Sequence, residues 1–174
     1  MTHFSQTIDT PDGPFTAVAG ADGAVLASGW TDSVEDVLSR VRPEHRPTEV
    51  EAGTVTALDA VVAYYRGEHA TVTSVPVVLH GTDGQVAGWE ALRRIAPGHP
   101  LTYTEFAAEL GNPQAVRAAA SVCARNPVAL FVPCHRVLRA DGSLGGFAWG
   151  EDVKRALLAR EERGERPGDS RPGA

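Results

Sequence analysis

The chain has 174 residues, of which 43% are hydrophobic, and its formal net charge at pH 7 is −6. This composition predicts a globular protein with a real hydrophobic core, arranged as one domain or as two small packed lobes. No apolar run approaches the roughly 18 residues of a membrane helix, and the first residues lack the basic and apolar regions of a secretory signal, so we expect a cytoplasmic protein with no membrane partner.

The first 80 residues predict a small α/β lobe. Segments separated by turns indicate an antiparallel meander of three strands, at 4–8, 15–19 and 24–28. Ser33 is placed to cap a helix that continues through Val41, and apolar spacing indicates a second helix over 55–65. A β-branched run over 71–79, interrupted by Pro76, predicts a further strand. No residue here has the pattern of a catalytic group, so we interpret this half as a support lobe.

The pattern becomes mostly helical after residue 81. A helix over about 85–95 is followed by two shorter ones, at 104–110 and about 114–125, separated by Gly111-Asn112-Pro113. Helix, short glycine-containing turn and helix is the outline of a helix-turn-helix. This shape occurs in DNA-binding proteins and also in plain helix packing, so it does not decide between them.

The helix over 114–125 lies in a segment without acidic residues. Residues 1–84 carry 4 basic and 12 acidic side chains, a net charge of −8, whereas residues 85–163 carry 10 and 8, a net charge of +2. From residue 110 to residue 140 there is no Asp or Glu, but there are four arginines: Arg117, Arg125, Arg136 and Arg139. A polyanion would meet this segment rather than the whole surface, unless the gap in acids arose by chance.

Two faces of this helix differ in character. The face that should pack inward carries Val116, Ala119, Ala120 and Cys123. The opposite face carries Arg117, Ala118, Ser121, Ala124 and Arg125. Small side chains framed by two guanidinium groups would let the helix backbone approach a groove closely, and the alternative is an ordinary solvated helix.

The segment Pro133-Cys134-His135-Arg136-Val137 places a thiol beside an imidazole. It follows an apolar run over 127–132, which predicts a short buried strand, and precedes a glycine-rich loop over 145–147. The thiolate is the reactive form of cysteine, and a neighbouring histidine makes it accessible near neutral pH. The other cysteine, Cys123, is interpreted as a small buried hydrophobe. Two cysteines are too few for a disulfide framework.

The last predicted helix, over 151–163, carries an acid on its buried arc, because Glu161 falls between Leu157 and Leu158. A buried carboxylate is costly unless it is paired, and His135 is the obvious partner. The alternative is a frayed last turn in which Glu161 is solvated. If paired, Cys134, His135 and Glu161 have the logic of a nucleophilic triad, which serves acyl transfer or direct displacement at an alkyl carbon.

Several motifs at fixed spacing resemble the O6-alkylguanine-DNA alkyltransferase family. They are Gly111-Asn112-Pro113, Arg117, Arg125-Asn126-Pro127, the segment from Pro133 to Val137, and Glu161. The resemblance is strong over residues 80–163. The first 80 residues resemble the variable N-terminal lobe of the family only loosely, through the segment from Ile8 to Pro14.

The resemblance implies an α/β N-terminal lobe over residues 1–80, ribonuclease-H-like, with a small antiparallel sheet and helices. It implies a mostly α C-terminal lobe over residues 81–163, with a winged-helix-like helix-turn-helix and the alkyl acceptor. We expect residues 164–174, which are rich in Gly, Pro and charge, to form a disordered tail.

The function implied is that of a methylated-DNA–[protein]-cysteine S-methyltransferase. Such a suicide enzyme repairs double-stranded DNA by taking an alkyl group from guanine O6. In the family the recognition helix enters the minor groove and the damaged nucleotide is flipped into the protein. We expect a monomer without a cofactor. Some members bind zinc in the N-terminal lobe, but this lobe has no cysteine, so we expect no metal.

The resemblance also implies roles for matching residues. Cys134 would be the alkyl acceptor, His135 would deprotonate it through a water, and Glu161 would orient His135. Three more residues fit pocket and hinge groups of the family: Asn126 as a hinge, Tyr103 as a group that rotates the target phosphate and hydrogen-bonds the base, and Lys154 as a pocket lysine.

The remaining implied roles concern the DNA and the pocket. Arg117 fits the arginine that takes the place of the flipped base, and the other expected DNA contacts are Gln114, Ala118, Ser121 and Arg125. The expected pocket residues are Val137, whose carbonyl would accept from the guanine amino group with that of Cys134, and Phe147, Ala148 and Trp149.

The chain departs from the family pattern at six positions. Gly84 and Gly88 replace apolar residues, so the helix near residue 85 would start late or be weaker. Ala120 and Ser121 replace glycines of the recognition helix. Ala148 replaces a common serine, and Trp149, where many members have glycine, would narrow the pocket and favour methyl over larger groups.

Two alternative functions stay open. A non-catalytic protein that binds alkylated DNA would share the helical motif and the pocket but would need no thiol; such relatives have Trp where this chain has Cys134. A cysteine hydrolase would carry the helical motif incidentally, and no sequence signature of an oxyanion hole supports it.

Overall fold

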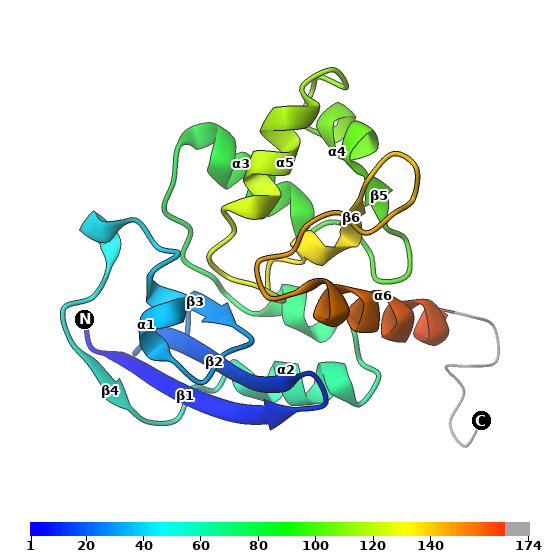
Figure 1. The fold of residues 1–174 in the computed structure, drawn as a ribbon. Helices are drawn as coiled ribbons and strands as arrows, with labels where there is room; N and C mark the ends of the chain where they lie inside the picture. The colour runs from blue at the N-terminus through cyan, green and yellow to red at the C-terminus, as the bar shows by residue number, and fades with distance from the viewer. Residues whose placement is uncertain (166–174) are drawn as a thin grey trace.

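The N-terminal half is organised around a four-stranded sheet with the strand order β3-β2-β1-β4 (Figure 1). The structure is a computed structural model that describes residues 1–165. β1 (His3–Thr10) and β2 (Gly13–Gly20) form a hairpin, β3 (Val25–Gly29) is antiparallel to β2, and β4 (Val50–Ala52) is parallel to β1. The three predicted strands are confirmed. The sequence did not predict β4, which is short and largely exposed.

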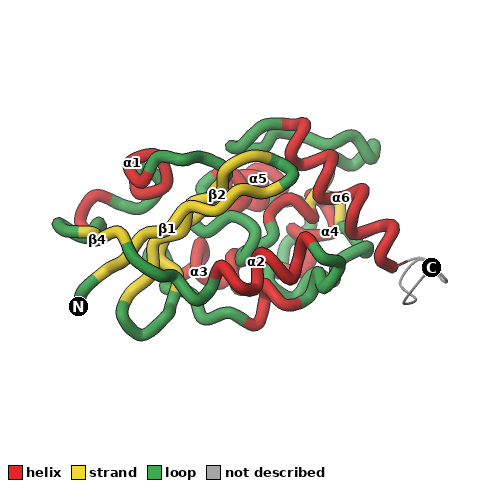
Figure 2. The backbone as a smooth tube through the Cα atoms, turned by 90° about the horizontal axis from the view of Figure 1, so that it is seen from below, coloured by secondary structure: helices red, strands yellow, loops and turns green. Residues whose placement is uncertain are grey.

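Two short helices cover opposite faces of this sheet (Figure 2). Successive strand residues point to opposite faces. Val18 therefore packs with α1 (Val34–Leu38), while Ala17 and Ala19 face the larger core that contains α2 (Leu58–Tyr65). Ser33 caps α1 as predicted, but both helices are shorter than expected.

The predicted strand over 71–79 is wrong. Its first part is a 3₁₀ helix, η2 (Thr71–Ser74), and Val77 forms only an isolated bridge to Val25. The Arg93 guanidinium, from the following helix, accounts for the difference, because it donates to the carbonyl oxygens of Thr73 (2.8 Å) and Val75. These carbonyls are therefore satisfied without a strand partner, and tertiary contacts override the β-branched composition.

In its described part, up to residue 165, the C-terminal half contains four α-helices and a two-stranded parallel sheet: α3 (Asp83–Leu92), β5 (Leu101–Thr102), α4 (Tyr103–Glu109), α5 (Val116–Ala124), β6 (Val137–Leu138) and α6 (Glu151–Glu165). α4 packs against α5 across a turn through Gly111, whose φ is 102°. α6 is two residues longer than predicted, and the remaining part of the predicted tail lies outside the described residues.

Capping boxes fix the first residues of α3 and α4. The Thr82 side chain accepts from the Gln85 N–H at 3.1 Å, and the Gln85 side chain accepts from the Thr82 N–H at 3.0 Å. Thr102 and Glu105 make the same reciprocal pair. This arrangement satisfies free N–H groups of the first turn. The expectation that Gly84 delays the start of α3 is therefore wrong.

The predicted strand over 127–132 is also wrong, although its burial is confirmed. Residues 128–132 are all at most 1% exposed. They make only isolated bridges, Ser28 to Val128 and Ala129 to Val132, because the chain reverses at Leu130, where φ is 73°. The Val132 N–H donates to the Val128 carbonyl at 2.9 Å and closes this turn.

One hydrophobic cluster joins the two halves. It includes Phe15 of the sheet, Val61 of α2, Phe131 of the buried turn and Leu157 of α6, each of them fully buried. The segment that follows the buried turn is therefore held between the halves. Within residues 1–165 no helix is both long enough and apolar enough to cross a membrane.

Gly84 and Gly88 provide a matched test of how α3 packs. A β-carbon at Gly84 would have no atom within 4 Å, whereas one at Gly88 would lie 2.7 Å from Cγ1 of the stiff, buried Val122 on α5. Gly84→Ala should raise the free energy of unfolding by about 0.5–1 kcal/mol through helix propensity. Gly88→Ala should lower it by about 1–3 kcal/mol through overpacking. Denaturant unfolding measures both, and equal effects would contradict the close approach of α3 and α5.

Candidate active site

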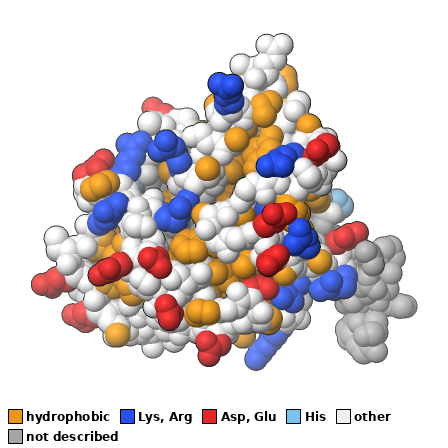
Figure 3. Space-filling view, viewed as in Figure 1, with side chains coloured by type: hydrophobic (Ala, Val, Ile, Leu, Met, Phe, Trp, Pro, Cys, Tyr) orange, Lys and Arg blue, Asp and Glu red, His pale blue; other side chains and the backbone are white. Residues whose placement is uncertain are grey.

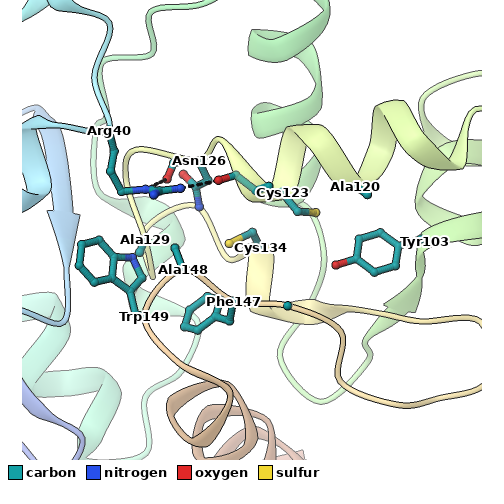
Figure 4. Close-up of a pocket in the computed structure, with 12 residues that line it drawn as sticks. Arg40, Tyr103, Ala120, Cys123, Asn126, Ala129, Cys134, Phe147, Ala148 and Trp149 are labelled. Carbon is teal, nitrogen blue, oxygen red and sulfur yellow. Dashed lines mark hydrogen bonds between the residues drawn. The ribbon is translucent and has the colours of Figure 1, made fainter.

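Cys134 lines a cavity of about 430 Å³ between the two halves (Figure 4). It lies in η3 (Cys134–Arg136), one turn of 3₁₀ helix, and is 8% exposed. The other walls come from the segment after α1, from α4 and α5, from the buried turn and from the loop before α6: Arg40, Tyr103, Ala120, Cys123, Ala124, Asn126, Ala129, Gly146, Phe147, Ala148 and Trp149. The cavity has the size of a small-molecule pocket.

The Glu161 carboxylate forms the centre of a buried network behind Cys134. Its Oε2 lies 2.6 Å from His135 Nε2 and accepts from the Tyr64 hydroxyl at 2.5 Å. Its Oε1 accepts from Arg136 Nε at 2.7 Å. All four residues are at most 1% exposed. The contact between His135 and Glu161 is therefore as predicted, and the alternative of a solvated Glu161 is wrong.

The charges in this network fix the state of His135. Burial alone would raise the pKa of the Glu161 carboxyl, but His135 and Arg136 outweigh burial and hold it well below its usual range. The ionised carboxylate accepts the Nε2–H of His135. Burial lowers the pKa of His135 despite the opposing charge of Glu161, so the ring is neutral near pH 7. Its Nδ1 is then the basic nitrogen, and among the described residues Nδ1 has no hydrogen-bond partner.

The Cys134 thiol is protonated at rest. Burial raises the pKa of this thiol, while Asn126, Lys154 and Arg40 act in the opposite direction. Burial also raises the pKa of Cys123, and a thiolate at Cys134 would raise it further. Of the two thiols in the cavity, only Cys134 has an adjacent neutral base and three groups that favour its thiolate.

Two buried polar side chains hold the chain around the thiol. Asn126 Nδ2 donates to the Val132 carbonyl at 2.7 Å, and Asn126 Oδ1 accepts from the Val128 N–H at 2.9 Å. Asn126 thereby connects the end of α5 to the turn before Cys134. Lys154 Nζ donates to the carbonyl oxygens of Val137 (2.8 Å) and Gly146 (3.4 Å), which anchors the pocket loop to α6.

The loop over 145–149 packs against the N-terminal half. The Phe147 ring lies 5.8 Å from that of Trp30, and the Arg40 guanidinium lies 5.9 Å from the Trp149 ring centroid. A β-carbon at Gly29 would lie only 2.1 Å from the Trp149 indole, so the indole occupies the space that glycine leaves open. The cavity wall therefore depends on both halves.

The structure places the predicted site residues in four groups. Three of them are buried behind the cavity and do not line it: His135, Lys154 and Glu161. Five pocket residues line the cavity with Cys134: Asn126, Tyr103, Phe147, Ala148 and Trp149. The predicted DNA contacts Gln114, Arg117, Ala118, Ser121 and Arg125 are exposed on α5 and its flanks, outside that cavity. Val137 is fully buried and does not line the cavity, and its carbonyl already accepts from Lys154.

One helix-face prediction was wrong. Val116, expected to be buried, is 37% exposed because it is the first residue of α5, and Val122 packs inward instead. Ala119 and Cys123 are buried as predicted, while Ala120 faces the cavity.

The sequence missed three residues of the site. Tyr64 of α2 and Arg40 of the segment after α1 come from the half in which no functional residue was expected. Arg40 Nε donates to the Asn126 carbonyl at 3.4 Å, and its Nη2 donates to the Ala124 carbonyl (Figure 4). No local pattern indicates either contact. Arg136 stands beside His135 in the motif, but its pairing with Glu161 depends on the tertiary structure.

Comparison with known proteins places this site in context. Residues 83–163 match the sequence model of a family described as "6-O-methylguanine DNA methyltransferase, DNA binding domain". The methylated-DNA–protein-cysteine methyltransferase of Mycobacterium tuberculosis is 39% identical over 163 residues, which cover 93% of each chain. The bifunctional transcriptional activator/DNA repair enzyme Ada of Escherichia coli is 45% identical over 95 residues, but the match spans only 27% of its length.

Solved structures resemble the whole described fold. The crystal structure of Mycobacterium tuberculosis OGT in complex with DNA superposes with a TM-score of 0.76 at 33% identity, covering 96% of this chain and 97% of that one. The O6-methylguanine-DNA methyltransferase of Pyrococcus kodakaraensis has a TM-score of 0.71 at 21% identity, covering 92% and 99%, and shows the shared mixed α/β fold alone.

Two ion pairs on α6 allow a matched test of the buried network. Glu161→Ala should lower the free energy of unfolding at pH 7 by about 3–5 kcal/mol, because it leaves the Arg136 guanidinium buried without its carboxylate. Glu151→Ala removes an exposed pair with Arg155, at 3.1 Å, and should cost less than about 1 kcal/mol. Denaturant unfolding compares the two variants, and similar losses of unfolding free energy would contradict the inference that stability depends on the buried Glu161 network.

Proposed function

The chain belongs to the family of methylated-DNA–protein-cysteine methyltransferases, and on that premise we propose that it repairs DNA by taking an alkyl group from guanine O6 onto Cys134, once per molecule. The observation that carries this proposal is that Cys134 lines the cavity, while the next residue, His135, lies buried behind it and is oriented by the ionised Glu161. A cavity of about 430 Å³ has room for an alkylated base.

His135 activates the thiol. The Nε2–H of His135 donates to Glu161, so Nδ1 of His135 is free to take the proton of Cys134. A water molecule relays this proton, as the resemblance to the family implies. The cost of forming the thiolate in a buried site is reduced by Lys154 and Arg40, whose positive charges favour it. Glu161 is here a positioning residue, because it acts on His135 and touches no reacting atom.

The chemical step is a displacement at the alkyl carbon. The Cys134 thiolate attacks that carbon, the S–C bond forms as the C–O6 bond breaks, and the electron pair leaves with the guanine, which takes up the proton that Cys134 lost. Burial raises the pKa of Tyr103 to about 12, so its hydroxyl keeps its proton and can donate to the departing base. A thioether is not readily hydrolysed, so the reaction ends after one turnover.

DNA approaches through α5. We interpret α4 and α5 as a helix-turn-helix of the lobe over 81–163, with α5 as the recognition helix in the minor groove and residues 1–80 as the supporting lobe. Arg117 is exposed on α5, where it can take the place of a nucleotide flipped into the cavity. A base must leave the stack before a buried thiol can reach it. The proposal extends to a monomer that acts in the cytoplasm.

The proposal is tested by incubation with duplex DNA that contains O6-methylguanine, followed by mass analysis of peptides. We expect a stoichiometric gain of one methyl group on the peptide of Cys134 and none on that of Cys123. Cys134→Ala should bind the duplex without removing the methyl group. Binding without modification by the natural chain would favour the non-catalytic alternative, and repeated turnover of a small ester or amide would favour a hydrolase.

Arg117→Ala separates base flipping from chemistry. Its transfer rate on duplex DNA should fall at least about tenfold, as expected when a charge-assisted contact is lost. Its rate with free O6-methylguanine base should equal that of the natural chain, because Arg117 lies outside the cavity. Single-turnover kinetics with both substrates measure the two rates. Equal losses on duplex and free base would argue against the flipping role.

A further inference from the structure

We propose that a cationic cleft beside the Cys134 cavity binds a backbone phosphate of the DNA, so that the N-terminal half takes part directly in DNA binding; this inference rests on the proposed function. The cleft, of about 290 Å³, is lined by Arg40 and Arg42 from the segment after α1, by Arg125 at the end of α5, and by residues of α3 and the segment before it. No Asp or Glu lines it.

The three arginines have hydrogen-bond donors left over. Arg42 Nη2 donates to Gln85 Oε1 at 2.9 Å, Arg125 Nε donates to Ser121 Oγ at 3.3 Å, and Arg40 donates to backbone carbonyls. Every one of these acceptors is uncharged. Among the described residues none of the three arginines is within 4.0 Å of a carboxylate. A guanidinium has five N–H donors in a fork that matches phosphate oxygens, so an anionic oxygen ligand fits this cleft.

The distribution of charge in the N-terminal half points to the same surface. Residues 1–84 contain only four arginines against 12 acids, yet Arg40, Arg42 and Arg46 stand within seven residues of one another. Glu44 is the one acid in that stretch; it is exposed in η1 (Pro43–His45) and forms no ion pair with them in the described part of the chain. Lys and Arg side chains gather between α1 and α3 on the face shown in Figure 3. The N-terminal half is acidic in total, but two of its four arginines, Arg40 and Arg42, lie in the cleft beside the end of α5.

The position of the cleft selects DNA as the source of the phosphate. Arg40 and Ala124 line both the cleft and the Cys134 cavity, so the two hollows share one wall. A base is joined through its sugar to two phosphates. A nucleotide whose base occupies the cavity must therefore place backbone phosphates near its mouth, on the side of α5, where Arg42 and Arg125 can reach them. His80 lines the cleft and is stacked on His45, with the two ring centroids 4.0 Å apart.

The test measures DNA binding against salt for Arg42→Gln, Arg125→Gln and the double variant, with a fluorescent duplex that contains O6-methylguanine. The double variant should bind about tenfold more weakly or worse at low salt, and the slope of log K against log salt should fall by about 0.9, the value for one released phosphate contact. Arg40 is left unchanged because it also lines the Cys134 cavity.

Matched controls separate charge, folding and chemistry. Arg66→Gln, an exposed arginine of the same half outside the cleft, should keep the natural affinity and slope. Arg42→Lys should keep the slope, and all variants should unfold as the natural chain does. Transfer from free O6-methylguanine base should be unchanged in Arg42→Gln. Natural affinity and slope in the double variant overturn the cleft proposal; failure of the natural chain to accept a methyl group overturns the proposed function instead.

Discussion

The structure depends on one buried carboxylate. Glu161 stands near the end of the last helix, yet its two oxygens hold the imidazole of His135, the guanidinium of Arg136 and the hydroxyl of Tyr64 at once. An isolated charge at this depth would be prohibitively costly, so the network is favourable only when all partners are present. The same contacts connect the motif around Cys134, α6 and α2. The carboxylate that orients the His135 ring therefore also joins the two halves.

Much of the site could be predicted from the sequence because its residues are close together in the chain or stand on a clear helical face. The Cys134-His135 pair is visible directly, and helical spacing places Glu161 between Leu157 and Leu158 on the apolar arc, although a solvated last turn stays open from the sequence alone. Tyr64 and Arg40 could not be predicted, because both belong to the N-terminal half and each contacts the site through one side chain only. The hydrophobic periodicity of a sequence does not indicate a contact of this kind.

The errors in secondary structure have a common physical cause. The runs over 71–79 and 127–132 are rich in β-branched or apolar residues, which are features of strands and of any buried extended chain. In the first run, Arg93 occupies the carbonyls that a neighbouring strand would need. In the second run, the chain reverses at Leu130 and is held by Asn126. Each run therefore makes only a few backbone hydrogen bonds to β3, through Val25 in the first run and Ser28 in the second, and side chains satisfy other backbone groups of both runs.

The missing side chain of Gly29 has a consequence for how substrate range can evolve. The Trp149 indole lies where a β-carbon at Gly29 would stand, 2.1 Å away. A residue of strand β3 and a residue of the pocket loop, 120 positions later in the chain, therefore form one steric unit. A smaller side chain at position 149 would leave a void against the sheet, and a β-carbon at position 29 would displace the indole. Directed-evolution libraries that vary position 149 should accordingly vary position 29 with it.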